Sequence, residues 1–175
     1  MRVIPLGKVV VATAGTPVQL GKTTLGSNCG VDDTTITVAS TNGCPGAGSL
    51  YRIDSEDILV TGRSGTSWTV RRGMNGTTPA THASGGAVTC LREVNALKAM
   101  VIAGLTGKCY LGGAGLSKTT FDNVVHEFWP NASGGVGDNI LVPKEPVRGS
   151  KMLLSDFWLD VAVSGEGLLI TGFVE

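Results

Sequence analysis

The feature that most constrains the fold is the alternation of short β-type runs with glycine-rich turns along the whole chain. Residues 34–39 alternate polar and apolar side chains, so Ile36 and Val38 are expected to face one side of a strand. Glycine supplies 26 of the 175 residues, about twice its usual share of roughly 7%. Charged residues make up only 16%, which disfavours long solvated helices. The sequence therefore predicts an all-β protein.

The same reasoning predicts how some strands pair. Residues 91–105 also fit a helical face, but Met100-Val101-Ile102 favours β-structure and Gly104 interrupts the helical pattern, so this segment is interpreted as mainly strand. Ser164-Gly165-Glu166 has the composition of a hairpin turn. Three pairings are expected: 2–6 with 8–12, 91–105 with 108–112, and 157–163 with 167–174.

The charge balance argues against a nucleic-acid partner. Lys and Arg together number 14, Asp and Glu together number 14, and the formal net charge is zero. Binding to phosphates normally requires a basic excess or a basic stripe, and the cluster formed by Arg63, Arg71 and Arg72 is thin. The apolar run Val9-Val10-Val11 is too short for a signal peptide or a membrane span. We therefore expect no nucleic acid and no membrane as partners.

Two glycine motifs resemble nucleotide-binding loops but fail on spacing or context. Gly21-Lys22-Thr23 lacks the glycine six residues before the lysine that a P-loop requires. Gly112-Gly113-Ala114-Gly115 lacks a third correctly spaced glycine and a β-α-β context. Both motifs are interpreted as turns, and no cofactor is expected.

Side chains capable of catalysis or metal binding do not form a recognisable pattern. The two histidines, His82 and His126, have no nucleophile motif beside them, so no catalytic residue is expected. The acidic residues lack calcium-loop spacing and are interpreted as solvated turn residues, with a weak divalent ion at a subunit contact as the open alternative. These acids are Asp32, Asp33, Asp54, Glu56 and Asp57.

The four cysteines, Cys29, Cys44, Cys90 and Cys109, lie far apart and form no zinc-binding pair. They are interpreted as small buried apolar residues, although a bond between Cys29 and Cys44 stays open. Neither reading supplies a metal site.

One motif is much more specific than these. Arg72-Gly73, Gly76-Thr77, His82, Gly85 and Val88 match the pattern R-G-x-x-G-T-x-x-x-x-H-x-x-G-x-x-V throughout. Together with the strand-like runs before it, residues 32–89 resemble a small β module that recurs in tailed-phage virion proteins, including tail and baseplate components. That resemblance implies a fold signature built on turn glycines, without catalytic residues.

The rest of the chain, about 1–25 and 94–175, looks like a short phage protein found with podovirus-type capsids. The matching stretches include residues 9–18, Gly107–Gly112 and 154–160. The resemblance implies a β-sandwich or jelly-roll-like frame, residues 1–26 plus 93–175, that binds the capsid. A small β-barrel-like module, residues 27–92, would be inserted into it.

This resemblance implies a non-enzymatic protein on the virion surface, assembled in the host cytoplasm, that decorates or cements the capsid. Its partners would be the major capsid protein and further copies of itself, as a dimer or trimer. A tail, baseplate or head–tail connector component is the alternative. Segments 1–8 and 131–150 are the expected contacts, through Arg2, Val3, Ile4, Pro5, Leu6, Val142, Pro143 and Pro146.

Aromatic side chains suggest two further readings. Trp129, Phe157 and Trp158 would serve as contact anchors or, as is commoner for aromatics in strands, as core residues. A carbohydrate-binding adhesin would need exposed aromatics beside acids, and only Tyr51 and Trp68 fit that description.

Overall fold

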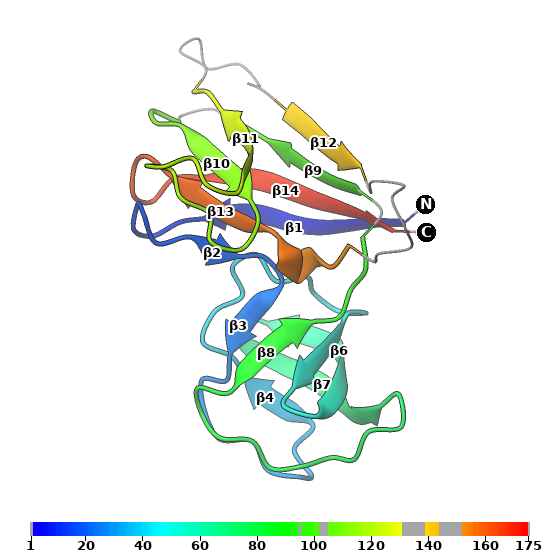
Figure 1. Ribbon diagram of the computed structural model, residues 1–175. Helices are drawn as coiled ribbons and strands as arrows, with labels where there is room; N and C mark the ends of the chain where they lie inside the picture. The colour runs from blue at the N-terminus through cyan, green and yellow to red at the C-terminus, as the bar shows by residue number, and fades with distance from the viewer. Residues whose placement is uncertain (1, 95, 102–104, 131–138, 144–151, 175) are drawn as a thin grey trace. The chain divides into compact units, whose positions relative to one another are not determined.

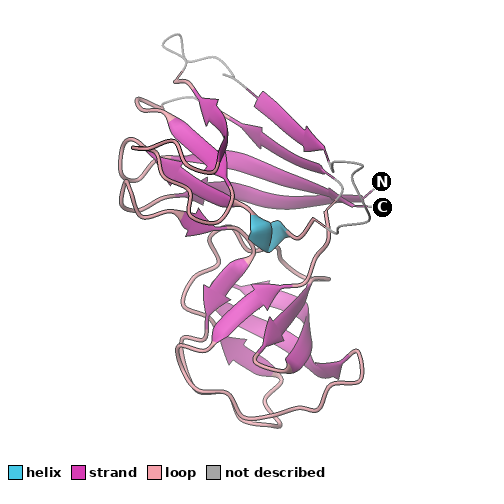
Figure 2. Ribbon diagram, viewed as in Figure 1, coloured by secondary structure: helices cyan, strands magenta, loops and turns pink. Residues whose placement is uncertain are grey.

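The computed structural model describes residues 2–94, 96–101, 105–130, 139–143 and 152–174. Among these residues every strand pairing is antiparallel, and one short 3₁₀ turn, Leu154–Asp156, interrupts the β-structure (Figure 2). No helix in this described part is long and apolar enough to cross a membrane. The all-β prediction is confirmed.

The chain divides into two compact units, which we call the frame and the inserted unit. The frame consists of Met1–Leu20 and Glu93–Glu175, and the inserted unit of Gly21–Arg92. The sequence placed the corresponding boundaries at 26/27 and 92/93. Each unit has its own apolar core.

The frame contains two four-stranded sheets, in the orders β1-β14-β9-β12 and β11-β10-β13-β2 (Figure 1). Counted along the frame alone, the first sheet holds strands one, eight, three and six, and the second holds five, four, seven and two. This is the strand order of a jelly roll. The bounds are β1 Arg2–Val10, β2 Val18–Gln19, β9 Ala96–Met100, β10 Cys109–Gly112, β11 Val124–Phe128, β12 Asn139–Pro143, β13 Trp158–Val161 and β14 Gly167–Val174.

Side chains from both sheets fill one core, as expected for a sandwich. The alternation within each strand sends one residue in two inward. Leu97 and Ala99 of β9 are fully buried in this core, as are Leu159 and Val161 of β13. The interpretation of 91–105 as mainly strand is confirmed for the described residues, with β9 at its centre.

The three expected pairings in the frame are wrong. Residues 2–10 form one strand rather than two, because Gly7, at φ +76°, produces a bulge instead of a reversal, and the strand pairs with β14. β9 and β10 belong to different sheets, and so do β13 and β14. In each of these two cases, two strands that follow each other along the chain lie in different layers of the sandwich.

The inserted unit is a single six-stranded sheet in the order β3-β8-β5-β6-β7-β4. The sheet curls until its two edges meet, where Leu25 bridges Val38 and the Gly26 N–H donates to the Thr37 carbonyl at 2.8 Å. The unit is therefore barrel-like. The bounds are β3 Lys22–Thr24, β4 Thr35–Thr37, β5 Leu50–Ile53, β6 Glu56–Ser64, β7 Ser67–Met74 and β8 Ala87–Cys90.

The interior of the inserted unit is built from alternating residues of its strands. Ile36 and Val38 are both buried, which confirms the period-two prediction. Tyr51 and Trp68 lie at the centre, with ring centroids 4.8 Å apart and no exposed surface. They are core residues and not exposed aromatics, so the observation behind the adhesin reading is wrong.

Candidate functional site

The structure separates the expected contact residues of the N-terminal segment into two groups. Ile4 and Leu6 are 7% and 9% exposed and pack in the frame core. The prediction that these two residues contact a partner is therefore wrong, because the alternation of side chains along β1 turns them inward. Val3, 53% exposed, and Pro5 lie on the opposite face of the strand. Residues 2–8 of this expected contact segment are part of strand β1.

The other expected contacts are distributed differently. The Arg2 backbone pairs with Val174 at the end of β14. Val142 and Pro143 lie in β12, opposite Leu97 and Ala96. Pro146 lies outside the described residues.

Val3 and Pro5 belong to a continuous surface on the outer face of the first sheet. The register of β1, β14 and β9 places nine side chains in three transverse rows. All nine are exposed or partly exposed, whereas the residues between them are mostly buried. We call this surface the outer face; its rows are Val3–Phe173–Ala96, Pro5–Thr171–Lys98 and Lys8–Leu169–Met100.

The composition of the outer face is unusual for solvated sheet. Six of its nine side chains are apolar, one is threonine, and its two charged residues, Lys8 and Lys98, are both basic. A contiguous apolar surface of this kind is typical of a protein contact. The positive charge favours a partner with acidic groups around an apolar centre.

The free edge beside the outer face is protected from uncontrolled strand addition. β1 ends its sheet on one side, and an unpaired strand is a template for aggregation. Pro5 has no N–H to donate, the bulge follows between Pro5 and Gly7, and Lys8 adds a charge. These devices leave the face available while blunting the edge.

The second feature is a buried ionic network in the inserted unit, centred on Glu56. This side chain has no exposed surface. Its carboxylate accepts hydrogen bonds from Arg72 Nε and Nη2, both at 2.7 Å, and lies 2.9 Å from His82 Nε2. The backbone N–H groups of Gly73 and Ala80 also donate to it, at 3.1 and 3.0 Å. Glu56 therefore ties β6 to β7 and to the loop that follows β7.

Arg72 links the network to further backbone and side-chain acceptors. Its guanidinium is 8% exposed. Besides Glu56, it donates to the carbonyls of Gly30, Asp33 and Ala80, at 2.7, 3.2 and 2.5 Å, and to Cys29 Sγ at 3.1 Å. A planar fork of five N–H donors suits this kind of multiple contact. The loops before β4 and after β7 are thus joined through one side chain.

Electrostatics favour the ionised form of Glu56. Burial alone would raise its pKa, but the hydrogen bonds from Arg72, His82 and the two backbone N–H groups outweigh burial and lower the pKa to about 2. A second pair lies beside it: the hydrogen bond from Arg52, at 2.7 Å, lowers the pKa of Asp57 against the opposing effect of burial. Glu56 and Asp57 are therefore paired interior anions, and their interpretation as solvated turn residues is wrong.

His82 completes the network. Its Nδ1 lies 2.7 Å from the Asp54 carboxylate and its Nε2 faces Glu56, while the ring is nearly fully buried. Both ring nitrogens and both Glu56 oxygens are occupied, so the buried part of the cluster holds two segments in place, and Asp54 is its exposed member. Its chemistry is that of a satisfied structural network. The sequence motif identified Arg72, Gly73 and His82, but it gave no sign that Glu56 is their common partner.

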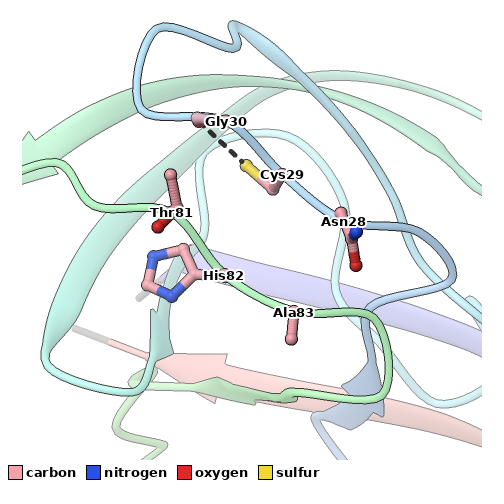
Figure 3. Close-up of a pocket in the computed structure, with 6 residues that line it drawn as sticks. All are labelled: Asn28, Cys29, Gly30, Thr81, His82 and Ala83. Atoms are coloured by element: carbon pink, nitrogen blue, oxygen red, sulfur yellow. Dashed lines mark hydrogen bonds between the residues drawn. The ribbon is translucent and has the colours of Figure 1, made fainter.

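A cavity of about 490 Å³ lies beside this network, between residues 28–30 and 81–83 (Figure 3). The Cys29 and His82 backbones bridge each other with two hydrogen bonds of 2.9 Å. Asn28 Oδ1 accepts from the Ser84 N–H at 2.9 Å. The two segments that line the cavity are therefore held together by backbone hydrogen bonds.

The remaining candidates from the sequence lie in structural positions. Within the described residues, no group of three or more His, Cys, Asp or Glu side chains is arranged to hold a metal. All four cysteines are buried and free, so the Cys29–Cys44 bond does not form. Burial is the main factor that raises the pKa of Cys44 and Cys109 to about 12 and of Cys90 to about 11, so these thiols stay protonated at neutral pH.

The three frame aromatics also separate. Phe157 is 6% exposed and packs in the frame core, and Trp158 is partly buried. Trp129, at 57%, is well exposed, with Lys108 Nζ lying 3.5 Å from the centre of its ring. Of these three, Trp129 alone has the exposure that a contact anchor requires.

In the described part of the chain, three features are candidates for function: the outer face, the exposed region around Trp129, and the Glu56 cluster. Comparison of the chain with protein-family models, with curated proteins and with solved structures finds no match.

Proposed function

We propose that this chain is a non-enzymatic structural protein of a tailed-phage virion, which decorates or cements the capsid by binding major capsid protein subunits. The observation that carries the proposal is the outer face, with six apolar side chains, two lysines and no acid in three ordered rows. A surface of this composition is costly to leave in water and suits burial against another protein.

The resemblance of the frame to podovirus-type capsid-associated proteins supports the same role. Jelly rolls serve many functions, so the fold alone does not decide between them. The ionic network adds weight to a structural role, because its charged groups are used to hold loops together. In this proposal the chain is located on the capsid surface, and it associates with copies of itself.

A component of the tail, baseplate or head–tail connector is the second candidate. It is favoured by the complete match of Arg72–Val88 to the motif of virion tail modules, and by the Glu56 network that stabilises this segment. In that case the inserted unit would make the essential contact, and the frame would act as its support.

Copy number separates the two candidates. We would quantify the chain in purified virions by mass spectrometry, relative to the major capsid protein. Decoration requires near-stoichiometric abundance, because each contact recurs over the whole shell. Abundance limited to a single vertex or tail would exclude capsid decoration and support the second candidate. Absence from the particle would exclude both.

A further inference from the structure

A second exposed surface lies on the other sheet of the frame, around β11. Three large apolar side chains there are more than half exposed: Phe121 at 55%, Val125 at 55% and Trp129 at 57%. Val125 and Trp129 are four residues apart, at and just beyond β11, and β11 is the edge strand of its sheet.

Side-chain contacts and strand register connect Phe121 to Trp129. The Phe121 ring packs edge-on against Tyr110, with centroids 6.1 Å apart, and Tyr110 lies opposite Glu127 in the pairing of β10 with β11. Glu127 is 2.7 Å from Lys108 Nζ, and Lys108 lies over Trp129. We call this connected surface the β11 patch; its members are Lys108, Tyr110, Phe121, Val125, Glu127 and Trp129.

The loop before β11 holds Phe121 in an unfavourable backbone conformation. Its φ is +60°, and that of nearby Asn123 is +56°. Asparagine tolerates this left-handed region, whereas a bulky aromatic residue there is an outlier. Such strain persists where the surrounding structure fixes it, and it is concentrated at functional sites. Here the strained residue is also one of the exposed members of the patch.

Charge distinguishes the partner of the β11 patch from that of the outer face. The charged residues of the outer face are both lysines, Lys8 and Lys98, so the charges of two such faces would repel each other. The β11 patch carries one cation, Lys108, and one anion, Glu127, already 2.7 Å apart. Two such patches related by a two-fold axis can place each cation near an anion, without net repulsion.

We propose that the β11 patch is the contact through which two copies of this chain associate about a two-fold axis. The inference rests on the self-association part of the proposed function and names its surface. It does not depend on capsid binding, and it can be tested on the isolated chain. Trp129 and Phe121 would act as the buried aromatic anchors of the contact.

The test is sedimentation equilibrium of the purified chain over a wide concentration range. We expect the wild-type chain to show a monomer–dimer equilibrium. Trp129→Ser should weaken dimerisation by roughly tenfold or more, as is usual for loss of an aromatic anchor. Val31→Ser is the matched control, because Val31 is 45% exposed but lies in the inserted unit; its dimerisation constant should equal that of the wild type.

Phe121→Asn supplies a readout that a general folding defect would not produce. Asparagine suits the left-handed backbone at this position, so the variant should melt at the same temperature as the wild type or higher while dimerising more weakly. A wild-type chain that stays monomeric or forms trimers would overturn the proposal. So would unchanged dimerisation in both Trp129→Ser and Phe121→Asn.

Failure of this test leaves the proposed capsid role standing, because copy number in the virion is measured independently. Conversely, a dimer that depends on Trp129 in a chain that is absent from virions would support the contact while refuting the proposed function.

Discussion

At the scale of single residues, the Glu56 cluster shows how a charged side chain can serve as core. A buried carboxylate is costly unless it is paired and hydrogen-bonded, and Glu56 meets both conditions through Arg72, His82 and two backbone N–H groups. Removing Glu56 would leave the buried Arg72 guanidinium without the carboxylate that it now contacts. This asymmetry makes the network a sensitive point for stability.

Glu56→Gln should destabilise the inserted unit in a pH-dependent way. The pKa of Glu56 is about 2 in the folded chain against an ordinary value of 4.5, so its ionised form stabilises the fold by an amount on the order of 3 kcal/mol. That contribution is complete above about pH 5 and is lost as pH falls through the folded pKa. The difference between wild type and variant should therefore shrink on acidification.

The measurement is urea unfolding at several pH values, followed by tryptophan fluorescence, to which buried Trp68 of the inserted unit contributes. Asp32→Asn, a change at an exposed turn, is the control and should show a small difference at every pH. A Glu56→Gln penalty that stays constant from neutral pH to pH 2 would contradict the assignment of the carboxylate as the ionised centre of the network.

This cluster also marks how far the sequence alone could reach at the residue scale. The motif from Arg72 to Val88 singled out the arginine and the histidine, but Glu56 lies 16 residues before Arg72 and was assigned to solvent. Acidic residues are mostly exposed, and only the folded pairing of β6 with β7 brings this one to its partners.

At the scale of strands and connections, the sequence predicted where strands lie better than how they pair. The segments around β9, β10, β13 and β14 were all expected as strands. Their short connections were interpreted as hairpins because turn composition is the same in both cases. Whether a short connection stays within a sheet or crosses a sandwich depends on non-local pairing, here with β1, β11 and β12.

Glu166 joins the two connections that cross the sandwich. Its carboxylate accepts from the Thr106 N–H and hydroxyl at 2.7 and 2.8 Å, and from the Gly107 N–H at 3.0 Å. Glu166→Ala should therefore destabilise the frame by about 1–2 kcal/mol, with faster amide hydrogen exchange at Thr106 and Gly107. Glu166→Gln retains one acceptor oxygen, so its stability and its exchange rates should lie between those of the wild type and those of Glu166→Ala. Unchanged exchange at both amides would show that the contact contributes nothing.

The outer face gives a prediction at the level of a sheet. Leu169 is 37% exposed at the centre of its row, between Lys8 and Met100. Leu169→Glu should leave the melting temperature nearly unchanged, since surface changes usually cost little, but lower occupancy on capsids by tenfold or more. Occupancy is measured by adding purified chain to particles that lack it. Val31→Glu is the control, and equal occupancy of both variants would argue against this face.

At the scale of the whole molecule, the two units have separate cores, and the chain passes between them at 20/21 and at 92/93. The sequence placed the boundaries at 26/27 and 92/93, whereas the compact inserted unit runs from Gly21 to Arg92. The difference arises because Lys22–Thr24 pairs with Ala87–Thr89 at the far end of the insertion. Such a long-range pairing has no local signature.

The inserted unit should fold by itself, and the frame should fold without it. The Cys90 N–H donates to the Gly21 carbonyl at 2.7 Å, so the two ends of the insertion are adjacent. We expect the isolated fragment 21–92 and a frame with a short Gly/Ser linker in its place both to give dispersed amide NMR spectra. A collapsed spectrum from either piece would show that the cores depend on each other.

The adjacency of those ends also fixes how the inserted unit would respond to mechanical load. Lys22 pairs with Thr89 in antiparallel register, and the chain leaves toward the frame from this same end of β3 and β8. Tension applied at these two chain ends would therefore break the hydrogen bonds between β3 and β8 one pair after another, and not all at once. The insertion would therefore begin to open at its base, at the pair Lys22–Thr89.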